Sequence, residues 1–235
     1  MARIQNTFLD AVEATLKDMG IQAHIRLLKA DGGAIPISLA RNEPVQSILS
    51  GPAASVMGIL ALSHEIEQGT SLLLDIGGTT TDIALIVDGS PVIDRDGMLL
   101  EGRRTLVRAL ASISIGVGGD SVIAVQGEGD TAQVTTGPNR LGAAMAFGGS
   151  VPTFLDALNT LDEHSTIPRG DVARSKAGIL SLAEEHRLDP KILAQKAVQN
   201  GLTHIHTACN RLIEQINARP IYTLAELRAR TKAYP

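Results

Sequence analysis

The residues of this chain best suited to chemistry lie close together between Ser71 and Asp88, in the segment SLLLDIGGTTTDIALIVD. An apolar run delivers one carboxylate, Asp75, and a second carboxylate, Asp82, precedes another apolar run. The turn between the two carboxylates supplies two glycines and three threonines, which are Gly77, Gly78, Thr79, Thr80 and Thr81. Two runs of this kind around a glycine-containing turn predict a β-hairpin.

This turn has the composition of a phosphate-binding loop. Glycine lets backbone N–H groups converge on an anion, because no Cβ stands in the way. The threonine hydroxyls add donors, and the carboxylate of Asp75 can hold a hydrated Mg²⁺ that neutralises the phosphates. The alternative is an ordinary tight hairpin with polar residues at its end, and the segment alone leaves both interpretations open.

The motif DIGGTTTD resembles the phosphate hairpin of the actin, Hsp70 and sugar-kinase superfamily of ATPases. More narrowly, it is similar to the hydantoinase/5-oxoprolinase family, whose hairpins follow the pattern D-x-G-G-T-x-T-D. Three further segments resemble that family in the same order along the chain: PVQSILSGPAASVMG (44–58), IGVGGDSVIA (115–124) and GPNRLGAAMAFGGSVPTFLDA (137–157). The chain departs from the family pattern at Asp120, where a glycine is usual, and at 146–148, where Ala-Phe-Gly replaces Cys-Tyr-Gly. No role of that cysteine carries over.

The resemblance implies ATP and Mg²⁺ as cofactors and gives the hairpin residues their expected roles. Asp75 would position Mg²⁺ or its water, and Asp82 would brace the hairpin or order a water, which makes these two the catalytic candidates. The cradle for the phosphates would be the backbone of Gly77, Gly78 and Thr79, helped by the hydroxyls of Thr79, Thr80 and Thr81. Gly118 and Gly119 form a second glycine turn at a strand end, which either approaches the nucleotide or packs closely against a strand.

The fold class that the resemblance implies is α/β: an actin-like ATPase (ribonuclease H-like) lobe with a mixed sheet and a phosphate hairpin flanked by helices. In that superfamily ATP lies between two lobes, and a hairpin that follows an SGPA helix belongs to the second. Residues 1–70 are therefore expected to be the tail of the first lobe, and residues 71–235 the second lobe without its C-terminal adenosine-binding end. A missing lobe of the same protein, or a partner subunit, would complete the site.

For the intact protein the resemblance implies ATP-dependent opening of a small cyclic amide, such as a hydantoin or 5-oxoproline. ATP phosphorylates the amide carbonyl oxygen, and the phosphate is then a good leaving group during hydrolysis. Two alternatives stay open: a subunit like that of acetone carboxylase, which activates a ketone in the same way, and a nucleotide-gated regulatory or reactivating module. The chain by itself is expected to fold, to bind ATP weakly or not at all, to leave ring amides intact, and to expose an apolar surface that favours homo-oligomers.

Composition argues against several other classes of protein. A formal net charge of −4 over 235 residues, without a basic run interleaved with aromatics, argues against binding to nucleic acid. No apolar run approaches the roughly 20 residues of a membrane span, and no signal peptide is recognised at the start of the sequence. A single cysteine, Cys209, excludes an internal disulfide and fits a reducing, cytoplasmic compartment.

Hydrophobic periodicity and capping residues predict the order of the elements. Helices are expected at 4–19, from Ser50 to about 67, at 153–161, at 172–187 after Asp171, and from 190 to about 217 after Asp189. Strands are expected at 23–28, in the glycine-threonine hairpin (71–77 and 81–87), at 91–100, at 107–115, and in a second hairpin at 122–125 and 133–136. Because a phosphate site must face a cleft, the hairpin turn should be exposed at the rim of the sheet while both apolar runs are buried.

Other polar residues receive no site from their pattern. His204 and His206 lie two apart on one helix and point away from each other, so they cannot share a metal ion, and Cys209 is expected in the core. Asp31 begins an Asp-Gly-Gly sequence, for which a plain turn is favoured over a contact with the cleft. Asp156 resembles the last aspartate of a family motif, and no role can be assigned to it.

Overall fold

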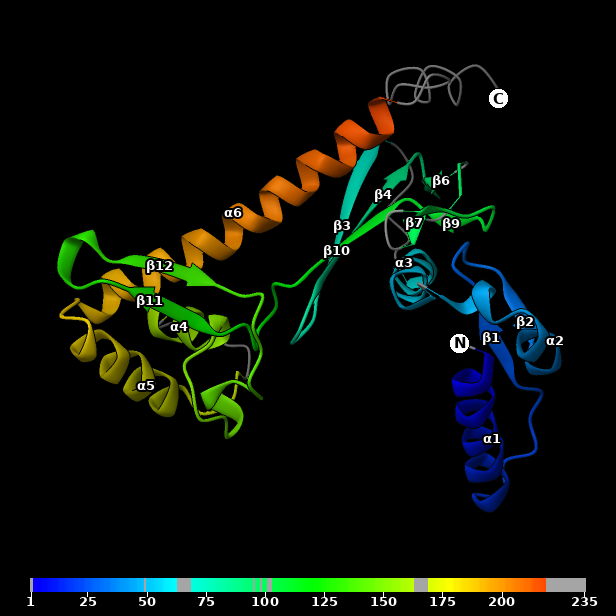
Figure 1. Cartoon of the computed structure of the whole chain (residues 1–235), viewed down its shortest axis with the longest axis horizontal. Helices are drawn as coiled ribbons and strands as arrows, with labels where there is room; N and C mark the ends of the chain where they lie inside the picture. Colours follow the sequence, from blue (N-terminus) through cyan, green and yellow to red (C-terminus); the bar gives the residue numbers. More distant parts are fainter. Residues whose placement is uncertain are drawn as a thin grey trace. The chain divides into compact units, whose positions relative to one another are not determined.

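The computed structural model describes residues 2–48, 50–62, 69–94, 96–97, 99–100, 103–162 and 169–218. Helices and strands are interspersed along the chain in a mixed α/β pattern (Figure 1). The chain divides into two compact units, one made of Met1–Leu73, Ala84–Ser112 and Ile216–Pro235, the other of Leu74–Ile83 and Ile113–Gln215. This division by compactness follows different boundaries from the expected lobes, so the assignment of residues 1–70 to a first lobe stays a prediction.

The first unit begins with helices and a small two-stranded sheet. In chain order these are α1 (Ala2–Asp18), the antiparallel pair β1 (Arg26–Leu28) and β2 (Ala34–Pro36), α2 (Ile37–Asn42), the 3₁₀ turn η1 (Pro44–Ser47) and α3 (Ser50–Leu62). The helices predicted at 4–19 and from Ser50 are confirmed, and the strand predicted at 23–28 is shorter than expected. The predicted end of the second helix near residue 67 lies outside the described residues.

The strand region predicted at 91–100 holds short strands and not one continuous strand: β5 (Ser90–Pro91), β6 (Ile93–Asp94) and β7 (Leu99–Leu100). Two further short strands, β8 (Arg103–Arg104) and β9 (Ala109–Leu110), follow it. β6 pairs with β9 and β7 with β8, both antiparallel. The chain cannot stay extended between β6 and β7, since Gly97 has a φ of 82°, a left-handed conformation that turns the backbone.

The predicted glycine-threonine hairpin is confirmed as β3 (Thr70–Ile76) and β4 (Thr81–Val87). The sheet order is β10–β4–β3, with β10 (Ser112–Ile115) on the other side of β4, and β5 also pairs with β4. Six of the seven β4 residues are buried, whereas Leu72 and Leu74 of β3 are each 43% exposed beside the buried Leu73. The expectation that both apolar runs are buried is therefore wrong for β3, because an edge strand covered on one face leaves alternate side chains exposed.

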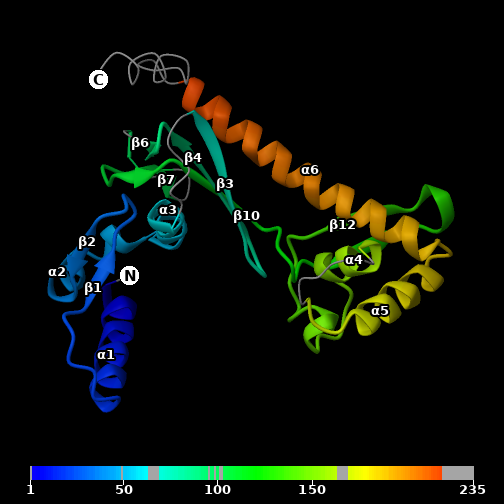
Figure 2. The same cartoon turned by 180° about the vertical axis from the view of Figure 1, so that it is seen from behind.

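The second unit packs a hairpin against three helices. The hairpin consists of β11 (Ile123–Gln126) and β12 (Gln133–Thr136), joined through the 3₁₀ turn η2 (Gly129–Thr131), and a further 3₁₀ turn, η3 (Met145–Phe147), precedes α4 (Phe154–Leu161), α5 (Val172–Glu185) and α6 (Pro190–Asn217). Figure 2 shows the hairpin and these helices side by side. All five elements contribute to one apolar core, whose members include Ile123, Val134, Ala157, Ile179, Ala183, Leu193, Ala194 and Ala197. The predicted second hairpin and the three helices are thus confirmed.

Carboxylates begin two of these helices, as the sequence predicts. Asp171 accepts the N–H of Arg174 at 3.0 Å, and Asp189 accepts the N–H groups of Lys191 and Ile192 at 2.9 and 3.0 Å. Each bond satisfies a donor that the first helical turn leaves open.

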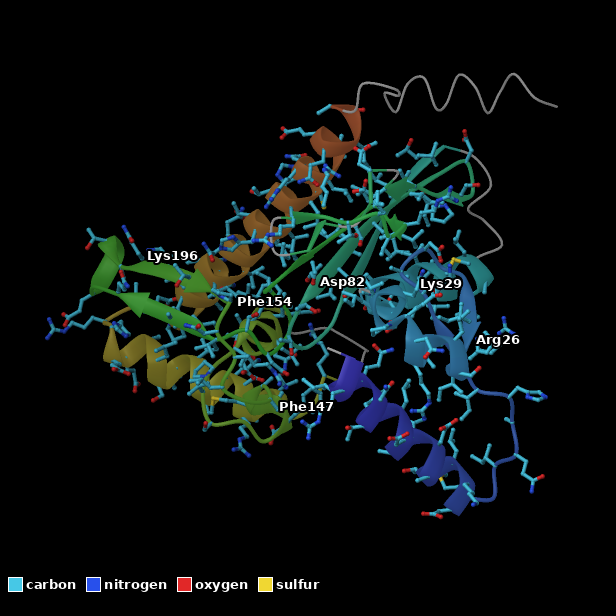
Figure 3. All side chains as sticks on the ribbon, turned by 45° about the vertical axis from the view of Figure 1, so that its right-hand side comes forward. Arg26, Lys29, Asp82, Phe147, Phe154 and Lys196 are labelled. Carbon is cyan, nitrogen blue, oxygen red and sulfur yellow. The ribbon has the colours of Figure 1, made fainter. Side chains whose placement is uncertain are left out.

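A glycine on α6, Gly201, lets the helix pack closely against the start of α4. A Cβ on Gly201 would lie 2.7 Å from the ring of Phe154 at the start of α4, so the missing side chain makes room for that ring. Phe154 is labelled in Figure 3. Two apolar residues of α6 do not face the core: Ile192 and Leu202 are 41% and 50% exposed. Each directly adjoins a buried position, Leu193 or Gly201, and successive helical residues point about 100° apart.

Candidate phosphate-binding site

Two backbone hydrogen bonds define the geometry of the glycine-threonine hairpin. The N–H of Gly77 donates to the carbonyl of Thr80 at 2.9 Å beside the turn, and the N–H of Asp88 donates to the carbonyl of Gly69 at 2.8 Å at the far end. The seven-residue strands β3 and β4 lie between these bonds, so they run antiparallel and pair residue for residue. Gly78 and Thr79 form the two-residue tip of the hairpin.

This register places Asp75 directly opposite Asp82 on the neighbouring strand. Residues that face each other across a ladder project to the same side of the sheet, and both carboxylates are half-buried. Figure 3 labels Asp82 on β4. Like charges in this arrangement repel each other, and a cation between them would remove that cost. Mg²⁺ is commonly held by one or two carboxylates together with phosphate and water, so the pair fits the predicted metal site.

The tip of the hairpin carries two exposed backbone donors, the N–H groups of Gly78 and Thr79. Within the part of the chain that the structure describes, the N–H groups of Gly78 and Thr79 have no hydrogen-bond acceptor. Gly77, Gly78 and Thr79 are also exposed, as predicted for the turn. Exposed backbone N–H groups without an internal acceptor can donate to an anion, so the tip is a candidate contact for a phosphate group.

The three threonines are not equivalent. Thr79 is exposed and Thr80 is half-buried, whereas Thr81 is fully buried. The hydroxyl of Thr81 donates to the carbonyl of Val117 at 2.6 Å and so ties β4 to the turn that follows β10. This contact supports a positioning role for Thr81, and its predicted contribution to phosphate binding stays a prediction.

The second glycine turn, at 116–119, packs directly on the hairpin turn. Gly119 N–H donates to the carbonyl of Gly77 at 2.9 Å, and Asp120 N–H donates to the carbonyl of Gly78 at 2.7 Å. Gly118 is buried, and a Cβ there would lie 2.5 Å from the oxygen of Gly77 and 2.7 Å from the carbonyl carbon of Gly78. Of the two interpretations of this turn, the geometry at Gly118 favours close packing, and a contact of Gly118 or Gly119 with nucleotide stays a prediction.

We expect Gly118→Ala to destabilise the second unit, because its methyl group would displace the hairpin backbone. Overpacking of this kind costs about 1–3 kcal/mol. Gly119→Ala is the matched control, since its Cβ would have its nearest neighbours at 3.8 and 3.9 Å, an ordinary contact. Urea denaturation of both variants checks the difference, and equal stability of the two would contradict this packing.

The sequence marks Asp120 only as a departure from the family pattern, and the structure shows what surrounds it. Its Oδ2 accepts Nε and Nη2 of Arg140 at 3.0 and 2.8 Å, and its Oδ1 accepts the N–H of Ala144 at 3.0 Å. A Cβ on Gly78 would lie 2.6 Å from the same Oδ2, so this carboxylate packs against the tip of the hairpin. Sequence reasoning missed Arg140, because only the fold brings residues 20 apart into contact.

Asp156 has a clear structural role that its sequence pattern alone did not assign. The side chain is fully buried and accepts the N–H groups of Met145, Ala146 and Thr153 at 2.9–3.0 Å and the hydroxyls of Thr153 and Ser175 at 2.9 and 2.6 Å. Thr153 and Asp156 form a capping box at the start of α4. The spacing Thr-x-x-Asp before an apolar helix is the sequence signal that identifies this cap.

The remaining polar candidates are structural. Burial works against ionisation of Asp31, but hydrogen bonds from Lys29 and Gly33 outweigh it and hold the pKa of that carboxyl below its ordinary value. Cys209 is buried as expected, and burial raises the pKa of its thiol. The described residues contain no group of three or more His, Cys, Asp or Glu side chains that could hold a metal ion. None of the described helices has the length and apolar character to cross a membrane.

The mixed α/β fold, with this hairpin at an edge of its sheet, is an actin-like fold. Two solved structures share it: nucleotide-free acetone carboxylase (TM-score 0.70, 23% identity, 88% of this chain and 30% of that one) and ATP-dependent caprolactamase from Pseudomonas jessenii (TM-score 0.63, 20% identity, 90% and 32%).

The sequence model of the hydantoinase/oxoprolinase family matches residues 1–221, and the chain belongs to this family. Caprolactamase subunit alpha of Pseudomonas jessenii is 26% identical over 67% of this chain and 23% of the relative. Acetone carboxylase beta subunit of Xanthobacter autotrophicus is 30% identical over 57% of this chain and 18% of the relative. The chain thus spans less than a third of the length of these proteins.

Proposed function

We propose that the hairpin tip at Gly77–Thr80 binds the phosphates of ATP in an enzyme that hydrolyses a small cyclic amide, such as a hydantoin or 5-oxoproline. The observation that carries this proposal is the pair of exposed N–H groups of Gly78 and Thr79 above the facing carboxylates of Asp75 and Asp82. Family membership and the caprolactamase relative support the class of reaction.

Each residue of the hairpin has a distinct role in this proposal. The N–H groups of Gly78 and Thr79 hold phosphate oxygens, and the hydroxyls of Thr79 and Thr80 add donors. Asp75 positions Mg²⁺ or one of its waters, and Asp82 braces the hairpin or orders a water. When bound, ATP would supply a phosphoryl group to the amide oxygen, which makes the amide carbon more electrophilic, so that water can add there while the ring nitrogen and inorganic phosphate are released.

The proposed enzyme is larger than this chain. ATP in this superfamily lies between two lobes, and we assign residues 1–70 to the first and residues 71–235 to the second. The missing part of the site comes from the rest of the same protein or from a partner subunit. Half of the phosphate contacts are then absent from the isolated chain. Each charge-assisted hydrogen bond contributes about 1.5–3 kcal/mol, so we expect the chain alone to bind ATP weakly.

A second candidate function is supported by the carboxylase relatives. One matched protein is the acetophenone carboxylase gamma subunit of Aromatoleum aromaticum, 27% identical over 66% of this chain, and the acetone carboxylase beta subunit is another. Activation of a ketone oxygen by phosphorylation would use the same hairpin. The substrate therefore distinguishes the two candidates, whereas the phosphate site does not.

Phosphate release by the intact protein tests the proposal. We expect MgATP hydrolysis to accelerate with a hydantoin, 5-oxoproline or a lactam, with one ring opened for each phosphate released. Stimulation only by a ketone together with bicarbonate would favour the carboxylase candidate. ATP binding without stimulation by any of these compounds would favour a nucleotide-gated regulatory module.

A further inference from the structure

Asp120 is held in place at three points beside the hairpin tip. Its backbone N–H donates to Gly78, its Oδ1 accepts Ala144, and its Oδ2 accepts Arg140. Its side chain is only 15% exposed. A carboxylate fixed in this way adds a negative charge to a tip whose own segment, DIGGTTTD, contains two aspartates and no basic residue.

Such a charge is unfavourable for an anion site unless a cation accompanies it. An ATP molecule at the tip would bring its phosphates toward Asp75, Asp82 and Asp120 together. Mg²⁺ at the facing pair compensates for the first two carboxylates, but Asp120 lies on a different element, the turn after β10. Arg140 is the cationic side chain that forms an ion pair with Asp120 in the described part of the chain.

Arg140 has donors left over after this ion pair. The guanidinium group has five N–H donors in a planar fork, and within the described residues only Nε and Nη2 form hydrogen bonds, both with Oδ2 of Asp120. The side chain is 45% exposed, so the unused donors remain accessible. The Asp120 Oδ2 that accepts Nε and Nη2 also lies against Gly78, which places the guanidinium group beside the tip.

We propose that Arg140 is a phosphate ligand of the nucleotide site, held beside the hairpin tip by Asp120 before the nucleotide binds. This inference rests on the proposed function of the hairpin. Guanidinium groups suit the task because their fork matches phosphate oxygens and stays charged at all physiological pH values. Prior fixation by Asp120 lowers the entropic cost of ordering a long side chain when the nucleotide arrives.

Titration calorimetry on the intact protein, with MgATP and with inorganic tripolyphosphate as separate probes, tests this role. We expect Arg140→Gln to weaken the binding of both probes about tenfold or more, and each factor of ten corresponds to about 1.4 kcal/mol of binding free energy. Arg140→Lys keeps the positive charge and loses the planar fork of donors. Its affinity for both probes should therefore lie between that of Arg140→Gln and that of the wild type. Arg187→Gln is the matched control, because Arg187 forms an exposed ion pair with Glu128 at 2.9 Å and should leave both affinities unchanged.

A double variant separates direct contact from simple neutralisation of Asp120. If Arg140 binds phosphate itself, the double variant Arg140→Gln with Asp120→Asn binds both probes as weakly as Arg140→Gln alone. Recovery of wild-type affinity in the double variant would overturn the inference, since Arg140 would then act only by neutralising its partner. Wild-type affinity in folded Arg140→Gln would also overturn it while leaving the proposed function intact. Failure of the wild-type protein to bind either probe would overturn both.

Discussion

Asp75→Asn should reduce ATP turnover by the intact protein about 100-fold or more, while MgATP affinity changes only slightly. Charge stabilisation by a bound metal contributes several kcal/mol in the transition state, and each 1.36 kcal/mol is a tenfold change in rate. The substitution removes charge that organises Mg²⁺ but leaves the N–H groups of Gly78 and Thr79 in place. Steady-state kinetics together with calorimetry measure the two effects separately.

Two further variants complete this experiment. Asp130→Asn removes an exposed carboxylate of the same unit and should behave as wild type in both measurements. Gly78→Val should weaken binding itself, because its Cβ would lie 2.6 Å from Asp120 Oδ2 and disturb the tip. Equal, mild effects of Asp75→Asn and Gly78→Val would mean that the hairpin is only structural.

Asp156→Ala should lower the free energy of unfolding by about 3–5 kcal/mol, more than the loss of an ordinary helix cap. The change leaves three backbone N–H groups and two hydroxyls without their acceptor, all around a fully buried side chain. It also separates η3 and α5 from the start of α4, because Asp156 joins all three elements. Chemical denaturation followed by circular dichroism gives the loss directly.

Asp189→Ala is the matched control for this substitution. Asp189 also begins a helix, but it accepts only two N–H groups and is more exposed, so its loss should cost about 1 kcal/mol. The loss of stability for Asp156→Asn should lie between those for Asp156→Ala and Asp189→Ala, since asparagine keeps one acceptor oxygen. A loss for Asp156→Ala no greater than that for Asp189→Ala would contradict the role of Asp156 as a buried junction.

Local patterns were sufficient to predict the elements of the second unit. Apolar periodicity and the caps Asp171 and Asp189 indicate α5 and α6. The glycine-threonine turn likewise indicates β3 and β4, which contribute residues to both units. The division of the predicted strand region at 91–100 into short strands could not be predicted, because pairing partners distant in sequence, such as β9 for β6, decide where two-residue strands form. The exposure of Leu72 and Leu74 likewise depends on sheet order, which composition does not encode.

In the candidate site, too, the sequence indicates some of the residues and only the structure reveals the others. The motif itself indicates Asp75, Gly78, Thr79 and Asp82, because their types and spacing are local. The facing register of the two carboxylates follows only from the observed hairpin closure. The ion pair of Asp120 with Arg140 and the contact of Thr81 with Val117 join residues 20 and 36 apart, so only the folded chain reveals them.

A crystal structure of the intact protein with Mg²⁺ and a non-hydrolysable ATP analogue tests the phosphate site most directly. We expect phosphate oxygens within hydrogen-bond distance of the N–H groups of Gly78 and Thr79, and Mg²⁺ on the side of the hairpin that carries Asp75 and Asp82. A nucleotide bound elsewhere, with the N–H groups of the tip facing only water, would contradict the assignment of this hairpin to phosphate binding.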